Sequence, residues 1–404
     1  MNTLKKLLFP LIMWSIIALF YSYQYLLQVS PGAMAEELMN DLRLNATELG
    51  TLAACYFYTY AGMQIPVGII IDRYDVRKPL SIAAAICALG ALIFGYAHNL
   101  PGIALGRLMI GCGGAFAVVS SLYVAANWLP IRYFTALSGS IVTLGMIGAI
   151  FGQYPLATMV DNLSWRSTML FFGIMGIIIT TLIWGFTRNR PNANHAKPHV
   201  LTGLKYILKN SQIWLLAIYG GLMFMSISIL GSLWGTPFLM AKYQITNTAA
   251  SANLSSLFIG LGIGCPLLCW ISDHFERRKI IMFIASFGTL ISIIPVLYFA
   301  IPYWLTAVLL CGLGFFMGGF LVSFNLAREV QSTGAAMGFM NTINMVGGAL
   351  MQSVCGLIMD LMHPNSIAKG QKIYTLLDFQ VALSIVPLTT IIALIMLYWI
   401  NERN

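Results

Sequence analysis

The chain has 404 residues, of which 59% are hydrophobic and 9% are charged, and its formal net charge is +9. A soluble globular protein carries about 25% charged residues, so this composition excludes a soluble enzyme or a soluble binding module. The positive charge alone would suit a nucleic-acid-binding protein, but its distribution along the chain argues against that function.

Apolar stretches of 18 or more residues recur throughout the chain, and each can cross about 30 Å of hydrocarbon as a helix. Lipid offers the backbone no hydrogen-bond partners, so these stretches must be helical. The sequence predicts twelve spans, at residues 7–29, 48–71, 79–97, 102–128, 135–159, 166–187, 211–240, 249–271, 280–300, 303–327, 334–360 and 375–399. Little of the chain remains outside them, so no separate catalytic domain is expected.

The basic residues gather on one side of this predicted topology. If the N-terminus is cytoplasmic, the inner loops hold 16 of the 22 basic residues. This is the positive-inside bias, which places both termini in the cytoplasm. The short loops favour a bacterial inner membrane, and no nucleic-acid partner is expected. All seven cysteines fall inside spans without metal-ligand spacing, so neither a disulfide, a metal site nor a cofactor is predicted.

Two charged hairpins, at residues 68–80 and 269–281, lie 201 residues apart. At that offset three charged positions match, and at an offset of 199 several residues further along match as well: Asp72 with Asp273, Arg77 with Arg278, Lys78 with Lys279, Gln153 with Gln352 and Asp161 with Asp360. Six spans separate equivalent positions, so the halves form a parallel repeat. The predicted domains are 1–187, a linker at 188–210 with a short interfacial helix, and 211–404.

The pattern Gly68-xxx-Asp72-Arg73-xxx-Arg77-Lys78 resembles the signature of the major facilitator superfamily. Arg107-xxx-Gly111 in span 4 and Trp165-Arg166 opening span 6 are similar to that superfamily too. The resemblance covers the whole chain and implies an all-α membrane protein, with 12 transmembrane helices in two pseudo-symmetric six-helix bundles. The chain departs from the pattern at Asp75 and at Cys269, where the family has glycine.

In the superfamily the charged hairpins are thought to latch the halves together on the cytoplasmic side. The resemblance therefore implies gating roles for Gly68, Asp72, Arg73, Arg77, Lys78, Arg132, Asp273, Arg277, Arg278, Lys279, Arg328 and Glu329. The alternative is that these charges only anchor loops beneath the lipid headgroups.

Polar side chains within spans are costly in lipid, so they face a cavity or another helix. The candidate solute-binding residues are Tyr21, Gln24, Tyr25, Gln28, Tyr56, Tyr60, Gln64, Arg107, Tyr123, Gln153, Trp234, Asn325, Asn341, Asn344 and Gln352. For Arg107 two roles stay open. Its guanidinium could bind a carboxylate or phosphate of the solute, or it could hold helices together through backbone carbonyls.

No acid and no histidine falls at mid-membrane in this topology, so proton coupling, exchange and facilitated diffusion all stay open. The sequence predicts a monomeric, secondary active or facilitative transporter that moves a small polar organic solute (amino acid, small peptide or carboxylate) by alternating access. Its partners are the lipid bilayer, the solute, and protons or a counter-substrate if transport is coupled. The alternative is an efflux antiporter for drugs or metabolites.

Two other classes of protein fit less well. A membrane-embedded enzyme would need His, Asp or Glu clustered near one interface, whereas the five histidines are scattered on both sides. We therefore expect no enzymatic activity. A receptor or scaffold that binds no solute would not explain why the charged hairpin is present in both halves.

Overall fold

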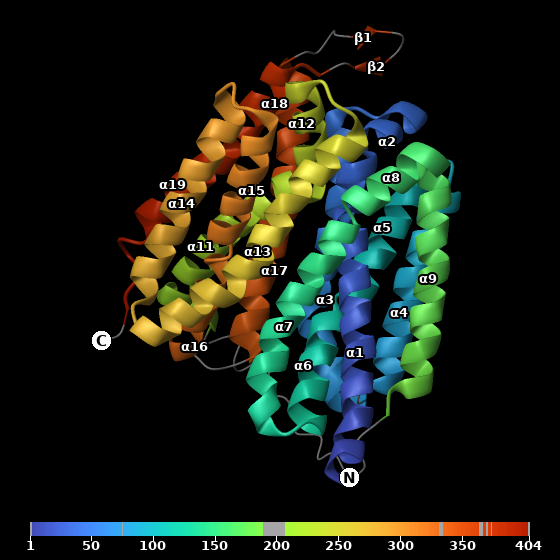
Figure 1. Cartoon of the computed structure of the whole chain (residues 1–404), viewed down its shortest axis with the longest axis vertical. Helices are drawn as coiled ribbons and strands as arrows, with labels where there is room; N and C mark the ends of the chain where they lie inside the picture. The colour runs from blue at the N-terminus through green and yellow to red at the C-terminus, as the bar shows by residue number, and fades with distance from the viewer. Residues whose placement is uncertain are drawn as a thin grey trace.

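The computed structural model describes residues 2–74, 76–188, 207–330, 334–362, 367–368, 371–372 and 374–402. Within them the regular secondary structure is helical except for one two-stranded antiparallel hairpin, β1 (Ile367–Ala368) and β2 (Gln371–Lys372). Twelve helical segments among these residues are long and apolar enough to cross a membrane. The predicted all-α membrane fold of two six-span bundles is confirmed (Figure 1).

The N-terminal bundle contains six spans, some of them built from two helices. Its elements are α1 (Asn2–Val29), the 3-10 turn η1 (Ser30–Met34), α2 (Ala35–Leu42), α3 (Ala46–Tyr74), α4 (Arg77–Tyr96), α5 (Leu100–Gly114), α6 (Phe116–Trp128), α7 (Ile131–Phe151), α8 (Tyr154–Leu163) and α9 (Trp165–Phe186).

The C-terminal bundle repeats this arrangement. Its elements are α11 (Ser211–Ser226), the π-helical segment η2 (Ile227–Trp234), α12 (Gly235–Tyr243), α13 (Asn247–Phe275), α14 (Arg278–Tyr298), α15 (Tyr303–Met317), α16 (Phe320–Val330), α17 (Gly334–Met362), α18 (Leu376–Leu383) and α19 (Ile385–Met396). Most of the predicted linker, residues 188–210, lies outside the described residues. Its interfacial helix and the limits of the three predicted domains therefore stay predictions.

Several spans that the sequence presents as single helices are broken in the structure. The first span ends at Val29 as predicted, and the helical chain then continues through η1, with Pro31 in its first turn, into α2. Gly152 and Gln153 separate α7 from α8, and Gly318 and Gly319 separate α15 from α16. Glycine lowers the stability of a helix interior, so these positions accept a local break that apolar periodicity does not reveal.

Figure 1 places the N-terminus at the lower end of the molecule, which we call the terminal face; it also holds the ends of α3 and α13. The opposite end, here called the far face, holds α2, α8, α12, α18 and the β-hairpin. The two bundles meet where α3 packs on α17, where α13 packs on α7 and α8, and where η1 crosses η2.

The contact between the bundles is tight near the far face and loose near the terminal face. A Cβ added at Gly50 of α3 would lie 2.5 Å from the carbonyl oxygen of Gln352 on α17. Near the terminal face, a Cβ on Gly68, Gly139 or Gly338 would meet no described atom within 4 Å. Helices α7 and α13 likewise diverge toward that face (Figure 1). The structure is therefore sealed at the far face and parted at the terminal face.

Close helix packing gives a first prediction. A Cβ added at Gly260 of α13 would collide with the carbonyl oxygen of Cys311 on α15. We expect Gly260→Ala to cost roughly 1–3 kcal/mol of stability, because backbone and neighbours must shift. Thermal unfolding in detergent micelles measures this cost. The control is Gly185→Ala, where an added Cβ meets no described atom within 4 Å; equal loss in both variants would contradict the packing shown.

Candidate solute-binding site

Polar residues of α1 and α3 form one connected cluster in the N-terminal bundle. Gln24 and Gln28 lie one turn apart on α1, as do Tyr56 and Tyr60 on α3, so each pair shares a helix face. The Tyr56 hydroxyl donates to Oε1 of Gln24 at 2.5 Å, and Oε1 of Gln28 lies 3.2 Å away. The rings of Tyr56 and Tyr60 stack, with their centroids 5.6 Å apart.

Two more tyrosines of α1 lie beside the neighbouring helix α7. The rings of Tyr21 and Tyr25 meet edge to face at a centroid distance of 5.1 Å. A Cβ added at Gly145 of α7 would lie 2.7 Å from the Tyr21 ring. A glycine at this position therefore makes room for the tyrosine pair between α1 and α7.

Arg107 of α5 lies against this cluster and is 1% exposed. Its guanidinium donates to the carbonyl oxygens of Leu27 at 2.7 Å and Ala53 at 3.2 Å. Its Cζ atom is 5.1 Å from the Tyr56 ring centroid, and Nε has no hydrogen-bond partner among the residues described. No carboxylate among the described residues pairs with it. The guanidinium thus ties α5 to α1 and α3, and its charge is not neutralised by an acid there.

The C-terminal bundle contributes asparagines from α17. Asn344 is fully buried, and within the described part of the chain neither polar atom of its amide group has a hydrogen-bond partner. Its amide lies beside Gly220 of α11, where an added Cβ would be 3.4 Å from Oδ1. One turn closer to the terminal face, Asn341 donates from Nδ2 to Oε1 of Gln64 at 2.9 Å. Candidate residues of the two bundles therefore touch along the seam between α3 and α17.

Three other candidates lie where η2 meets its neighbours, and a nitrogen of each side chain donates to a backbone carbonyl. Oε1 of Gln153 also accepts from the Thr236 hydroxyl at 3.2 Å. Gln153 donates from Nε2 to the Gly231 carbonyl at 2.9 Å. Trp234 donates to the backbone carbonyl of Gln352 at 3.1 Å, and the Gln352 side chain donates to the Ser228 carbonyl at 2.9 Å. The two remaining candidates, Tyr123 on α6 and Asn325 on α16, are half-buried and belong to helices that run toward the terminal face.

The sequence analysis did not single out the serines Ser226, Ser228 and Ser232, at or within η2. All three are buried, and their hydroxyl oxygens have no hydrogen-bond partner in the part of the chain that the structure describes. Three serines within seven residues of an otherwise apolar span were a visible signal. The π-helical turn could not be read from the sequence, although such turns often accompany functional sites.

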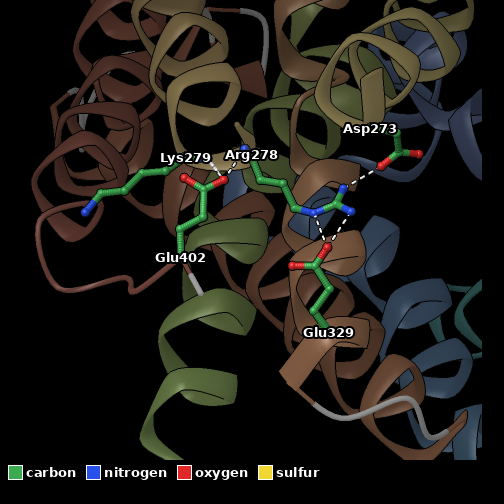
Figure 2. Close-up of polar contacts among 5 residues, drawn as sticks. All are labelled: Asp273, Arg278, Lys279, Glu329 and Glu402. Atoms are coloured by element: carbon green, nitrogen blue, oxygen red, sulfur yellow. Dashed lines mark hydrogen bonds and ion pairs between the residues drawn. The ribbon is translucent and has the colours of Figure 1, made fainter. Parts of the chain in front are cut away.

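The charged hairpin of the C-terminal bundle forms an ion-pair cluster (Figure 2). The Arg278 guanidinium lies between the carboxylates of Asp273 and Glu329 and pairs with both. Glu402, after α19, accepts from the backbone N–H groups of Arg278 and Lys279 and so caps the start of α14. Lys279 donates from Nζ to the Ile400 carbonyl at 2.9 Å. The cluster joins parts of one bundle in this conformation.

The equivalent hairpin of the N-terminal bundle is described only in part. Arg77 lies over the Trp184 ring, with Cζ 4.6 Å from the centroid, and donates to the Trp184 carbonyl at 3.1 Å. The side chains of Asp72 and Arg132, whose pairing the sequence suggested, lie outside the described residues. The other candidate gating cations, Arg73, Lys78, Arg277 and Arg328, are exposed.

Comparisons with known proteins agree with this two-lobed membrane fold. The chain is 21% identical to the uncharacterized transporter YybO of Bacillus subtilis over 83% of this chain and 84% of YybO. It is 24% identical to the lysosomal dipeptide transporter MFSD1 of Danio rerio, over 82% and 77% of the two chains. Its fold matches a bacterial homologue of the lysosomal transporter Spinster with a TM-score of 0.79 at 14% identity, covering 96% of both chains.

Two bundles of six spans with a polar seam define the fold of a membrane transporter. The family model of the Major Facilitator Superfamily matches residues 12–352 and 220–404. The chain belongs to that superfamily, and the resemblance seen in the sequence is confirmed. It is a multi-pass integral membrane protein and a solute transporter.

The bonds of Arg107 give a second prediction. Arg107→Ala removes the donor from the buried carbonyls of Leu27 and Ala53, and each orphaned acceptor costs roughly 1–3 kcal/mol. We expect the variant to unfold at a lower temperature without any solute present. Arg328→Ala, which removes an exposed cation, is the control. A variant that keeps full stability but no longer responds to a stabilising solute would instead make Arg107 a direct solute ligand.

Proposed function

We propose that this transporter moves a small polar organic solute by alternating access, as a secondary active or facilitative carrier. The solute class is an amino acid, a small peptide or a carboxylate. The observation that carries the proposal is a set of buried polar atoms without hydrogen-bond partners near the seam. Gln24 Nε2, both amide atoms of Asn344 and Gln352 Oε1 belong to it, and none of them has a partner among the described residues.

Buried polar atoms without partners cost free energy in a lipid-embedded bundle, and a solute with donors and acceptors would recover that cost. Gln24 and Asn344 come from opposite bundles, so the affinity for a solute bound to both would change when the bundles move relative to each other. Such coupling between binding and the position of the two bundles is what alternating access requires.

The charge of Arg107 supports an anionic group on the solute. Its guanidinium is held by backbone carbonyls and pairs with no described carboxylate. The positive charge therefore acts on the polar cluster of α1 and α3 from the side of Tyr56 where Arg107 lies. A solute carboxylate beside Gln24 and the tyrosines would be attracted without touching the guanidinium. The relative from Danio rerio is named a dipeptide transporter, and a dipeptide has such a carboxylate.

We also propose the topology in which the terminal face is cytoplasmic and the membrane is the bacterial inner membrane. The basic loops of the predicted topology support this orientation. With that orientation the parted terminal face is inward-facing. The charged hairpins would latch the bundles together when the terminal face closes, and we propose a monomer as the working unit.

A third prediction tests the solute class. Purified protein in proteoliposomes is given radiolabelled amino acids, dipeptides and organic acids, with and without an imposed proton gradient. We expect uptake of at least one anionic or zwitterionic solute. Uptake that follows the gradient would show proton coupling, whereas uptake of lipophilic drugs alone would support the efflux alternative and sink the proposal.

The same assay tests the site. We expect Gln24→Ala and Asn344→Ala to lower uptake at limiting solute by about tenfold, the equivalent of one lost hydrogen bond. Gln380→Ala is the matched control, because this glutamine of α18 donates only to the Leu297 carbonyl of its own bundle. Equal uptake by all three variants would place the solute elsewhere.

A further inference from the structure

Two aspartates that the sequence repeat pairs, Asp161 and Asp360, lie at the far face, and each reaches across to the other bundle. Asp360 lies in the last turn of α17, and Asp161 occupies the equivalent place in the last turn of α8. Neither belongs to the charged hairpins of the terminal face. Their partners are the first residues of α3 and α13, which are also equivalent in the repeat.

In the first of these contacts, Asp360 accepts hydrogen bonds from the first turn of α3. Oδ2 of Asp360 accepts from the backbone N–H of Thr47 at 2.9 Å and from the Thr47 hydroxyl at 2.6 Å. The Tyr374 hydroxyl donates to Oδ1 of Asp360 at 2.7 Å and accepts from the Ala46 N–H at 2.8 Å. Burial, together with the hydrogen bond to Asp360, raises the pKa of Tyr374. Tyr374 therefore stays a neutral donor to the carboxylate.

The first turn of α3 thus has its backbone donors divided between the two bundles. Asn45 accepts from the Glu48 N–H, and Glu48 accepts from the Asn45 N–H, so these two form a capping box within the N-terminal bundle. The N–H groups of Ala46 and Thr47 are satisfied by the C-terminal bundle. A carboxylate at a helix N-terminus is also favoured by the helix dipole.

The second contact is the pseudo-symmetric counterpart. Asp161 of the N-terminal bundle accepts from Nδ2 of Asn247 at 3.0 Å and from the Thr248 hydroxyl, both in the first turn of α13. Thr248 lies 201 residues after Thr47. Asn247 also donates to the Ala33 carbonyl at 2.9 Å, which adds a further bond between the bundles. Each bundle therefore holds the start of one helix of the other bundle with an aspartate.

We propose that Asp161 and Asp360 are the paired gate residues that hold the far face closed, and that both contacts must break before the site can open to that side. When the far face opens, the first turns of α3 and α13 move away from the aspartates, and water takes over the hydrogen bonds that each partner loses. The closed far face is thus stabilised by charge-assisted hydrogen bonds that the open state lacks. This inference rests on the proposed alternating access, but it does not depend on which solute is carried.

The contacts are not equivalent in strength. Among the contacts between described residues, Asp360 accepts from a backbone N–H and two hydroxyl groups, whereas Asp161 accepts from one amide and one hydroxyl. Loss of Asp360 should therefore shift the equilibrium toward the open far face more than loss of Asp161. Loss of both should shift it furthest, since both contacts act on the same conformational change.

The test measures the distance between spin labels at Tyr96 and Trp304, which are exposed at the far face on opposite bundles. Protein in nanodiscs carries Asp161→Ala, Asp360→Ala or both, and no solute is added. We expect a longer-distance population that grows from the parent through Asp161→Ala and Asp360→Ala to the double variant, by about tenfold in open-to-closed ratio for Asp360→Ala.

The matched control is Asp41→Ala. Asp41 also lies near the far face, but it pairs with Arg166 of its own bundle at 2.9 Å. Its loss should leave the distance distribution unchanged. Thr47→Val with Thr248→Val removes the hydroxyl donors while keeping both aspartates, and serves if an aspartate variant folds poorly; we expect the same direction of shift. Distances that stay unchanged in every gate variant, or that change equally in Asp41→Ala, would overturn the inference.

Discussion

Close backbone contact between α3 and α17 is the constraint on which the rest of the structure depends. Both are continuous 29-residue helices that run from one face of the molecule to the other. Gly50 and Gly356 let their backbones approach near the far face. Because each helix is long and unbroken, the contact at one end fixes how far the two bundles part at the other.

The same two helices carry much of the candidate site. Tyr56, Tyr60 and Gln64 follow one face of α3, while Asn341 and Asn344 belong to α17, so the seam between the bundles is lined by candidate solute-binding residues. Arg107 braces this arrangement from behind by binding carbonyls of α1 and α3. Because Arg107 is buried within the membrane-spanning bundle, water does not screen its charge, and the electrostatic potential at the candidate site is positive.

Much of the fold could be predicted from the sequence, because hydropathy and register are local or periodic signals. The apolar runs marked twelve spans, and the match of Asp72 with Asp273 indicated two parallel halves. The breaks at η2 and Gly152 were not predictable, since they depend on packing between helices. The site was predictable only as a set of polar positions.

Which of those positions meet is a tertiary property. Arg107 binds Leu27, 80 residues earlier in the chain, and Asp360 binds Thr47, 313 residues away. The repeat register did pair Asp161 with Asp360, and extending it to the helix starts would have paired Thr47 with Thr248. No sequence pattern, however, shows that these residues cross from one bundle to the other. The candidate list was therefore informative about residue type and incomplete about partners.

The most direct measurement compares the reaction of a thiol reagent with two cysteines on one helix, Gly338→Cys and Ser353→Cys of α17, in nanodiscs without solute. Gly338 has no described atom within 4 Å of an added Cβ, whereas Ser353 lies at the sealed end of the seam, 3.4 Å from the Thr51 hydroxyl. After subtraction of the parent's seven cysteines, modification at 338 should be much faster. Faster modification at 353 would mean that the far face is not the closed one.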